Sequence, residues 1–221
     1  MKATGWEKVY QQKGDLQGYF WVLPKIKRYA TIFKKKGYER ILDLACGTGR
    51  HTLYLAKRGF EVYATDMSAT GLKMAREKAA VLGLTDIHFQ QHDMRTIPFT
   101  DNFFDAVICT LAIHHGTAAQ VRQTVDEIRR VLKKGGKVIT DMPSVMTERK
   151  SRGVEIEKNT YYLDHGDIED DVPHHYTTRE EVISFFENFS SASIRLVTFN
   201  YVGREDKQKH FSKRFYITAI K

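Results

Sequence analysis

The stretch ILDLACGTGRHT, residues 41–52, holds residue types whose order suggests chemistry. An apolar run leads to Asp43 and is followed by a turn of small residues with Gly47 and Gly49, and then by a pattern typical of a helix start. Glycine lets a ligand approach the main chain, and the first turn of a helix offers free N–H groups and a positive dipole end. Packing alone does not require this order, so the stretch predicts contact between a ligand and the backbone.

Two further acids follow later apolar runs. Asp66 ends the second run and Asp93 follows the third. A carboxylate at Asp66 can accept hydrogen bonds from both hydroxyls of a ribose, and one at Asp93 can accept from an exocyclic amine. Met67 and Met94, beside these acids, can form soft walls for a purine ring. The acids therefore predict a nucleoside-containing ligand.

Nicotinamide adenine dinucleotide is the first such ligand to consider. Its fingerprint requires G-x-G-x-x-G/A, whereas GTGRHT places Thr52 at the third position. The spacing therefore argues against this dinucleotide.

Histidines are the candidates for moving a proton near pH 7. Three clusters offer them: His114–His115, His165 and His174–His175. Neighbours in an extended chain point to opposite sides, so we expect at most one member of each pair to face the ligand. We take His115 and His174 as the catalytic candidates, and we expect His114 to point away toward packing or solvent. The alternative is that these histidines cap helices or line solvent.

A metal site and a cysteine nucleophile are the other chemistries to consider. A metal site can be imagined from Asp164, His165, Asp167 and the pair at 174–175, but their spacing matches no ligand pattern, so no metal is expected. Cys46 and Cys109 are interpreted as small buried packing residues rather than nucleophiles.

Short apolar, β-branched runs alternate with helical patterns, and these elements must position the residues above. The runs predict strands at 40–45, 61–65, 86–91, 104–110 and 137–142. The segments between them predict helices at 50–59, 68–83 and 117–136. The last of these opens with a capping box of Thr117 and Gln120 and closes at Gly135–Gly136. Strand and helix in alternation predict parallel strands with right-handed crossovers, a doubly wound α/β sheet.

The end of the chain departs from this rhythm. A helix expected at 177–189, with Thr178 and Glu181 as its capping box, precedes strands at 193–203 and 211–220. Too few residues separate these two strands for a helix, so they must pair antiparallel. We therefore expect a seven-stranded, mostly parallel sheet that ends in an antiparallel hairpin, within one domain of residues 1–221.

Two segments are expected to cover the ligand site. Residues 1–37 form an N-terminal helical cap, and residues 143–176 form a lid on the substrate side. The walls of the lid are expected from Tyr161, Tyr162, His174 and Tyr176.

The net charge is +8, and it is unevenly distributed. Residues 1–40 hold ten Lys and Arg against three Asp and Glu, whereas residues 159–178 carry five acids and no Lys or Arg. The basic segment PKIKRYATIFKKKGYER has helical spacing of Ile26, Tyr29, Ile32 and Phe33, which indicates an amphipathic surface helix. The alternative is a binding surface for nucleic acid or another polyanion.

Other features of the composition bear on location. No stretch reaches 18 apolar residues, so no membrane span is expected. The first residues lack an apolar signal core, and two cysteines suit a reduced compartment. These features favour the cytoplasm.

The motifs together resemble those of class I S-adenosylmethionine-dependent methyltransferases, of the small stand-alone type that includes tellurite-resistance-like enzymes. DLACGTG resembles the first motif of the family, ATDMS the second, QHDM the third and FDAVICTLAIHH the fourth, and EIRRVLKKGGKVI resembles the segment leading into strand five. The likeness covers residues 38–142 closely and 177–221 in topology. Ala45 stands where the commonest pattern has glycine. The resemblance implies a Rossmann-like methyltransferase fold.

The resemblance also implies S-adenosylmethionine as methyl donor and a set of residues that bind it. Asp43 fixes the turn that cradles the methionine moiety, and Asp66 takes the ribose hydroxyls. Met67 and Met94 flank the adenine, whose edge is read by Asp93 and the main chain at Met94. The donor-binding residues so implied are Asp43, Ala45, Cys46, Gly47, Thr48, Gly49, Asp66, Met67, Asp93, Met94, Thr110 and Leu111.

Three classes of function remain open. The leading one is methyl transfer by in-line displacement to a small-molecule acceptor, a metabolite or a metalloid oxyanion, by a monomer or homodimer. The second is an RNA or protein methyltransferase that uses the basic N-terminal helix. The acidic lid and the lack of an N-P-P-Y-like motif after strand four argue against it. The third is a non-catalytic S-adenosylmethionine binder, which the intact first motif disfavours.

Overall fold

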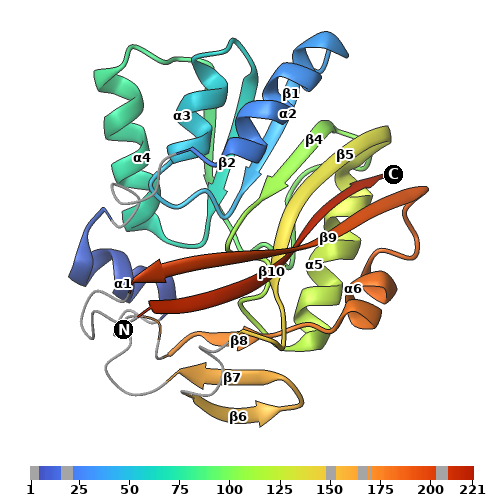
Figure 1. Cartoon of the computed structure of the whole chain (residues 1–221). Coiled ribbons are helices and arrows are strands. Elements are labelled where there is room, and N and C mark those ends of the chain that lie inside the picture. Colours follow the sequence, from blue (N-terminus) through green and yellow to red (C-terminus); the bar gives the residue numbers. More distant parts are fainter. Residues whose placement is uncertain (1–4, 16–21, 148–152, 164–168, 170, 203–208) are drawn as a thin grey trace.

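The computed structural model describes residues 5–15, 22–147, 153–163, 169, 171–202 and 209–221 (Figure 1). The strands of its larger sheet are β1 (Arg40–Leu44), β2 (Glu61–Asp66), β3 (Ile87–Gln91), β4 (Phe104–Cys109), β5 (Leu132–Pro143), β9 (Ser191–Val202) and β10 (Lys209–Ile220). Their spatial order is β3-β2-β1-β4-β5-β10-β9. A smaller sheet contains β6 (Gly153–Glu157), β7 (Thr160–Leu163) and β8 (Pro173–His175), in that order.

The larger sheet is parallel from β3 to β5 and antiparallel at its other end. Strand β1 pairs in parallel with β2 and β4, and β4 pairs in parallel with β5. Strand β10 lies antiparallel to both β5 and β9. The predicted seven-stranded, mostly parallel sheet with a terminal antiparallel hairpin is confirmed.

The part of the chain that the structure describes contains six helices, and at least four of them pack on the two faces of this sheet. The six are α1 (Gly5–Lys13), α2 (Pro24–Lys35), α3 (Arg50–Ala56), α4 (Ala69–Val81), α5 (Ala118–Val131) and α6 (Arg179–Phe185). Side chains of α2 and α3 pack on one face of the central strands, where Phe33 and Leu55 meet Ile41 and Ile108. Helices α5 and α6 pack on the other face (Figure 1). Burial of an apolar stripe from each helix makes this a layered α/β architecture.

The ends of the helices follow local sequence signals at some places and not at others. Both predicted capping boxes, Thr117 with Gln120 and Thr178 with Glu181, are present. The predicted end of the third helix at Gly135–Gly136 is wrong, because α5 stops at Val131 and β5 begins at once. Leu132 is extended, fully buried and paired with Phe104, so strand pairing with β4 overrides the glycine signal.

The two covering segments are partly described. Of the expected cap over residues 1–37, helices α1 and α2 are described, and residues 1–4 and 16–21 are not. The expected lid over 143–176 contains the small sheet, whereas 148–152, 164–168 and 170 lie outside the described residues. In Figure 1 the small sheet lies at the lower edge of the view, and α1 lies at the lower left, above it. Among the helices of the described residues, none is both long and apolar enough to cross a membrane.

Candidate functional site

The turn that follows β1 has an unusual backbone. Ala45, Gly47 and Gly49 have φ angles of 57°, 56° and 85°. Positive φ is strained for alanine, so a glycine at position 45, as in the pattern that the first motif resembles, would relieve that strain. A Cβ atom on Gly49 would lie 3.0 Å from the Cβ of Ala75 in α4, so this position also requires glycine for space. The turn therefore presents bare backbone at the end of β1, and α3 begins directly after it.

Asp43, in the strand before this turn, stabilises the start of the helix after it. Its side chain is buried and accepts a hydrogen bond of 2.5 Å from the hydroxyl of Thr52 in α3. Burial raises the pKa of Asp43 to about 7, against the hydrogen bond from Thr52 and the charge of Arg50, which lower it. Asp43 thus connects β1 to the start of α3.

Asp66 lies at the end of β2, beside the same turn. Its two carboxylate oxygens accept hydrogen bonds of 2.8 Å from the backbone N–H groups of Gly47 and Ser68. Burial raises the pKa of Asp66, and these hydrogen bonds act in the opposite direction. An ionised carboxylate has about four acceptor sites, so Asp66 keeps acceptor capacity beyond its backbone donors at Gly47, Ser68 and Met67. A ribose hydroxyl can use this remaining capacity.

Asp93, Met67 and Met94 differ in their exposure and in their contacts. The carboxylate of Asp93 forms a bidentate pair with Arg95 of the same loop, and this pair lowers the pKa of Asp93. Met67 is 49% exposed, whereas Met94 is partly buried against the core. Gln91 donates to the carbonyl of Met67 at 2.9 Å and so connects the ends of β2 and β3.

The other predicted turn residues are enclosed. Cys46 and Cys109 are buried, and burial raises the pKa of both thiols, which agrees with their interpretation as packing residues. The hydroxyl of Thr48 donates to Asp15 at 2.6 Å, and Lys78 pairs with the same carboxylate at 2.6 Å. Residue Asp15, just after α1, thus holds the turn from outside.

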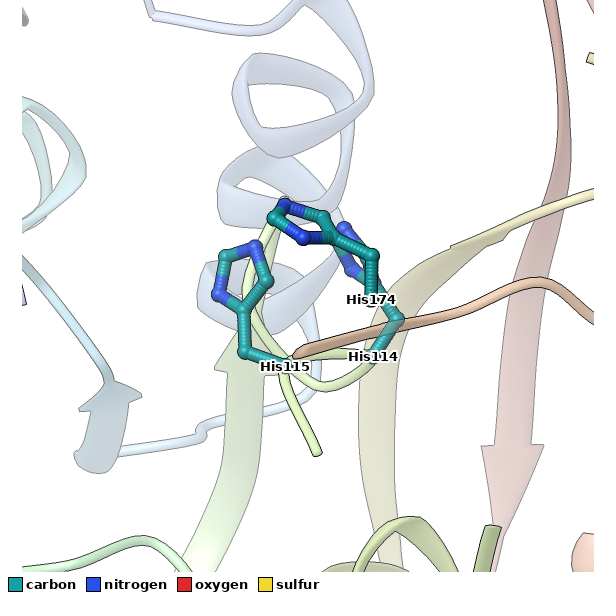
Figure 2. Close-up of side chains that lie close together, drawn as sticks. All are labelled: His114, His115 and His174. Atoms are coloured by element: carbon teal, nitrogen blue, oxygen red, sulfur yellow. The ribbon is translucent and has the colours of Figure 1, made fainter. Parts of the chain in front are cut away.

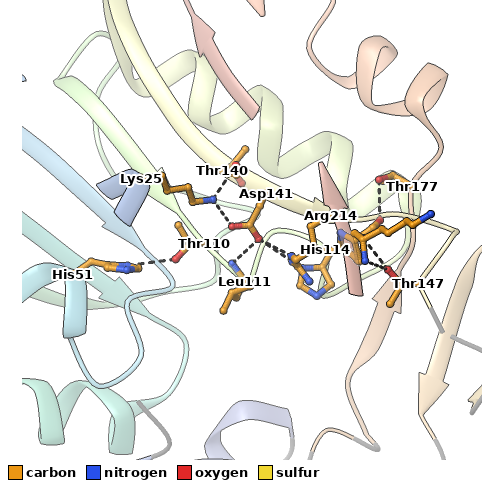
Figure 3. A network of polar contacts seen from close by, with 12 residues as sticks. Lys25, His51, Thr110, Leu111, His114, Thr140, Asp141, Thr147, Thr177 and Arg214 are labelled. Atoms are coloured by element: carbon orange, nitrogen blue, oxygen red, sulfur yellow. Dashed lines mark hydrogen bonds and ion pairs between the residues drawn. The ribbon is translucent and has the colours of Figure 1, made fainter. Parts of the chain in front are cut away.

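Beyond β4, Leu111 has a φ of 60° and donates its backbone N–H to Asp141 at 3.2 Å (Figure 3). Asp141 is fully buried at the end of β5, between Lys25 of α2 at 2.5 Å and Arg214 of β10 at 2.8 Å. Burial acts to raise the pKa of Asp141, but the two cations outweigh it and hold the pKa below its ordinary value. Two cations and one carboxylate thus fix the strained backbone at Leu111.

Thr110 precedes this strained residue and contacts a buried histidine. Its hydroxyl lies 3.3 Å from Nδ1 of His51, whose Nε2 accepts the N–H of Leu23 at 3.4 Å. Burial, together with the charges of Arg50 and Lys25, lowers the pKa of His51 to about 3. His51 is therefore neutral, with its proton on Nδ1 toward Thr110.

Helix α1 covers the turn, and sequence reasoning missed its residues. Glu7 accepts hydrogen bonds from the hydroxyls of Ser68 and Thr70, both at 2.6 Å, and from the N–H of Thr70 at 3.1 Å. Burial acts to raise the pKa of Glu7, but these hydrogen bonds lower it to about 2. The buried ring of Tyr10 lies against Gly71 of α4, where an added Cβ would approach it to 3.1 Å. The helical spacing of WEKVY was the available signal.

The N-terminal end of α1 reaches the histidines instead. The indole N–H of Trp6 donates to Nδ1 of His115 at 3.1 Å, and the two ring centres are 5.2 Å apart. The N–H of Gly5 donates to Asp171 at 3.0 Å. One helix thus contacts both the start of α4, beside the turn after β1, and the histidines that follow β4.

Three histidines meet in one cluster (Figure 2). The rings of His114 and His115 have centres 4.2 Å apart, and His174 of β8 lies 5.5 Å and 4.8 Å from them. The expectation that His114 points away from His115 is wrong, because the N–H of His115 bonds to the carbonyl of Ala112 in a turn, where alternation of an extended chain does not apply.

The second histidine pair follows the predicted alternation. Strand β8 is extended, and His175 points away from the cluster toward Thr160 at 2.8 Å and Glu181 at 3.1 Å. Of the expected lid walls, Tyr161 contacts Tyr176 at a ring distance of 5.8 Å, whereas Tyr162 is 38% exposed. Asp164, His165 and Asp167 lie outside the described residues.

Comparison with known proteins identifies the central part of the chain. Residues 41–136 match the family described as methyltransferase domain. The match makes this part of the chain a methyltransferase domain. A SAM-dependent methyltransferase from Methanosarcina mazei shares its fold, with a TM-score of 0.71 and 18% identity over 91% of this chain and 99% of that one.

Curated relatives match the methyltransferase domain over part of their length. Demethylmenaquinone methyltransferase from Thermus thermophilus is 37% identical over 115 residues, 51% of this chain and 51% of the relative. Demethylmenaquinone methyltransferase from Clavibacter sepedonicus is 39% identical over 101 residues, 46% of this chain and 40% of the relative. The chain thus spans about half the length, or less, of these two relatives.

Proposed function

We propose that the protein transfers a methyl group from S-adenosylmethionine to a small-molecule acceptor. The observation that carries this proposal is the position of α1. Through Glu7 it contacts the start of α4, beside the turn of residues 45–49, and through Trp6 it contacts the histidine cluster. A site enclosed in this way suits a small acceptor better than a macromolecule, which needs an open face. The relatives named for demethylmenaquinone favour the same class of acceptor.

S-adenosylmethionine, when bound, supplies a methyl group on a positively charged sulfur. The buried carboxylate of Asp66 would accept hydrogen bonds from the ribose hydroxyls. The backbone of residues 45–49 would hold the methionine part. Met67 and Met94 would flank the adenine, with Asp93 at its edge once that carboxylate shares its pairing with Arg95. Thr110 and Leu111 would line the methionine side, where the strained φ of Leu111 is a feature typical of functional sites.

The remaining task of the chain is alignment and proton removal. An in-line displacement gains most from holding donor and acceptor in position, and enclosure by α1 and the small sheet would exclude water. His115 and His174 remain the candidates to take a proton from the acceptor, and His114 joins them because it shares the cluster. Carboxylates of Glu7, Glu169 and Asp171 on the same side would repel a polyanionic acceptor such as RNA.

Calorimetry on the purified protein tests the donor assignment. We expect it to bind S-adenosylmethionine and S-adenosylhomocysteine but not NAD. Asp66→Ala should weaken binding by about 2–4 kcal/mol, because two charge-assisted hydrogen bonds are lost. Asp86→Ala, at an exposed carboxylate before β3, is the matched control and should bind normally. Tight binding of NAD, or unchanged affinity in Asp66→Ala, would contradict the assignment.

A transfer assay with labelled S-adenosylmethionine tests the acceptor class. The expected result is label in members of a panel of small metabolites and metalloid oxyanions, and none in bulk RNA or protein. Label in RNA, with binding that weakens steeply as salt is added, would favour the basic face of α2 as an RNA-binding surface instead.

A further inference from the structure

The histidine cluster has a feature that proton transfer alone does not use: its three imidazoles are close enough to share one ion. His114, His115 and His174 each offer one ring nitrogen, and these three atoms lie within 4.8 Å of one another. Ligands of a tetrahedral zinc ion stand roughly 3.3–3.4 Å apart, given bonds of about 2.0–2.1 Å to nitrogen. Small side-chain rotations would therefore bring the three nitrogens onto a single ion (Figure 2).

The tautomer of His174 adds a fourth group. Its Nδ1 lies 2.8 Å from the carbonyl oxygen of Val172, which can only accept, so Nδ1 carries the proton. In the neutral ring Nε2 is then a bare acceptor, yet it lies 2.9 Å from the carboxylate of Glu169. Two acceptors at this distance require a positive charge between them, either a proton or a metal ion. A ring N–H held by a backbone carbonyl is also the usual outer support of a metal-binding histidine.

The backbone that carries the cluster is fixed from both sides. His115 and His174 form an antiparallel bridge, and the N–H of His175 bonds to the carbonyl of His114 at 2.8 Å. Next to it, the N–H of Gly116 bonds to the carbonyl of Pro173 at 2.9 Å. His114 and His174 are buried, so the packing around them also holds their rings in place. Preorganised, neutral imidazoles are the ligands that divalent transition metals prefer.

We propose that His114, His115 and His174, with Glu169 as fourth ligand, bind a divalent first-row transition metal ion such as Zn²⁺. Imidazole and carboxylate ligands favour ions of this group over Mg²⁺ or Ca²⁺, which prefer oxygen alone. The ion lies at the end of β4, so an anionic oxygen or sulfur of an acceptor can become its next ligand. That last role rests on the proposed methyl transfer, whereas the binding of the ion does not.

Trp6 competes with the ion for His115. Its indole N–H can only donate, and it occupies Nδ1 of His115. If His115 binds the ion through Nδ1, the ion takes the place of the indole N–H. If His115 binds the ion through Nε2, its Nδ1 carries a proton and can no longer accept a hydrogen bond from the indole N–H. Either way the ion moves Trp6 off His115. In a Trp21→Phe background Trp6 is the only tryptophan, and its fluorescence reports the displacement.

The test is titration of the full chain, stripped with a chelator and without methyl donor, with Zn²⁺ by calorimetry and with Co²⁺ by visible absorption. We expect one equivalent of each ion, Co²⁺ bands typical of four or five ligands, and a change in Trp6 emission. His174→Ala should lower the affinity by at least about 10–100-fold. His88→Ala, at a histidine with 55% of its side chain exposed, is the matched control and should bind normally.

Two gentler variants keep the test decisive if His174→Ala fails to fold. Glu169→Gln retains all three imidazoles and should weaken Zn²⁺ binding at least several-fold, whereas Trp6→Phe should strengthen it by removing the competitor. The proposal is overturned if the wild-type protein binds no stoichiometric Zn²⁺, or if Glu169→Gln and the folded histidine variant bind it as well as the wild type. Because no methyl donor is present, these outcomes are independent of whether the protein transfers methyl groups.

Discussion

Asp43 and Asp66 are buried carboxylates at the ends of neighbouring strands, but they hold the turn of residues 45–49 in different ways. Asp66 accepts two backbone N–H groups, whose dipoles favour its charge. Asp43 accepts the hydroxyl of Thr52 and lies fully within the core. The difference in hydrogen bonding makes Asp43 the residue whose charge state should respond to pH near neutrality.

Asp43 gives a prediction for stability against pH. A carboxyl with a higher pKa in the folded than in the unfolded chain stabilises the fold below the unfolded value, and this stability is lost as pH rises through the folded value. For Asp43 the window runs from 3.8 to about 7. Relative to Asp43→Asn, the wild type should lose up to about 4 kcal/mol of unfolding free energy across it. Urea unfolding of both proteins from pH 4 to pH 8 measures this loss. If the difference in unfolding free energy between the wild type and Asp43→Asn does not change with pH, the prediction is contradicted.

At the scale of elements, α1 is the helix on which the closed site depends. It is short, and its attachment to α4 combines the packing of Tyr10 with the carboxylate of Glu7, which accepts three hydrogen bonds from Ser68 and Thr70. The pKa of Glu7 is lowered from 4.5 to about 2, so the contribution of its carboxylate is present above pH 4.5 and is lost as pH falls toward 2. Short segments held by few contacts are those that open locally.

Replacing Glu7 by Gln should therefore loosen α1 without unfolding the sheet. We expect amide exchange in residues 5–13 to accelerate several-fold and donor affinity to fall several-fold, because the neutral amide is a weaker acceptor at the start of α4. Glu77→Gln makes the same charge change on the solvent side of α4, where 64% of the side chain is exposed, and should leave both quantities unchanged. Equal exchange rates in all three proteins would show that α1 is held by packing alone.

The strands of the larger sheet, both capping boxes and the terminal hairpin could be predicted because their signals are local, whereas the three strands of the small sheet were expected only as a lid. A capping box needs four residues, and a strand pattern needs five or six. The end of α5 could not be predicted in this way, because it is set by the pairing of Leu132 with Phe104, which is distant in the sequence. The contacts of Glu7 and Trp6 join residues 61 and 109 positions apart, so no window of sequence contains them. The alternation of side chains predicted for both histidine pairs holds in the extended strand at His174, but it fails at His115, where the backbone forms a turn.

At the scale of the whole molecule, the basic N-terminal segment does not present all of its charge to solvent. Lys25 belongs to the basic N-terminal segment, yet its side chain is only 11% exposed and is paired with Asp141 in the interior. On α2 the exposed cations include Lys27, Arg28 and Lys35. On the side of the histidine cluster lie Glu169 and Asp171 instead. The charge that remains on α2 is therefore set apart from the acidic groups beside the proposed acceptor site.

The basic face of α2 should consequently have no part in methyl transfer to a small acceptor. Lys27→Glu with Lys35→Glu lowers the net charge from +8 by four, to +4. We expect kcat and KM for S-adenosylmethionine and for a small acceptor to stay within about two-fold, since the exposed charges act mainly through screened, long-range fields. Lys73→Glu with Lys134→Glu changes the net charge equally on other exposed positions and controls for it. If transfer falls only in the α2 variant, and wild-type activity drops steeply with salt, α2 binds a polyanionic acceptor and the small-molecule proposal is wrong.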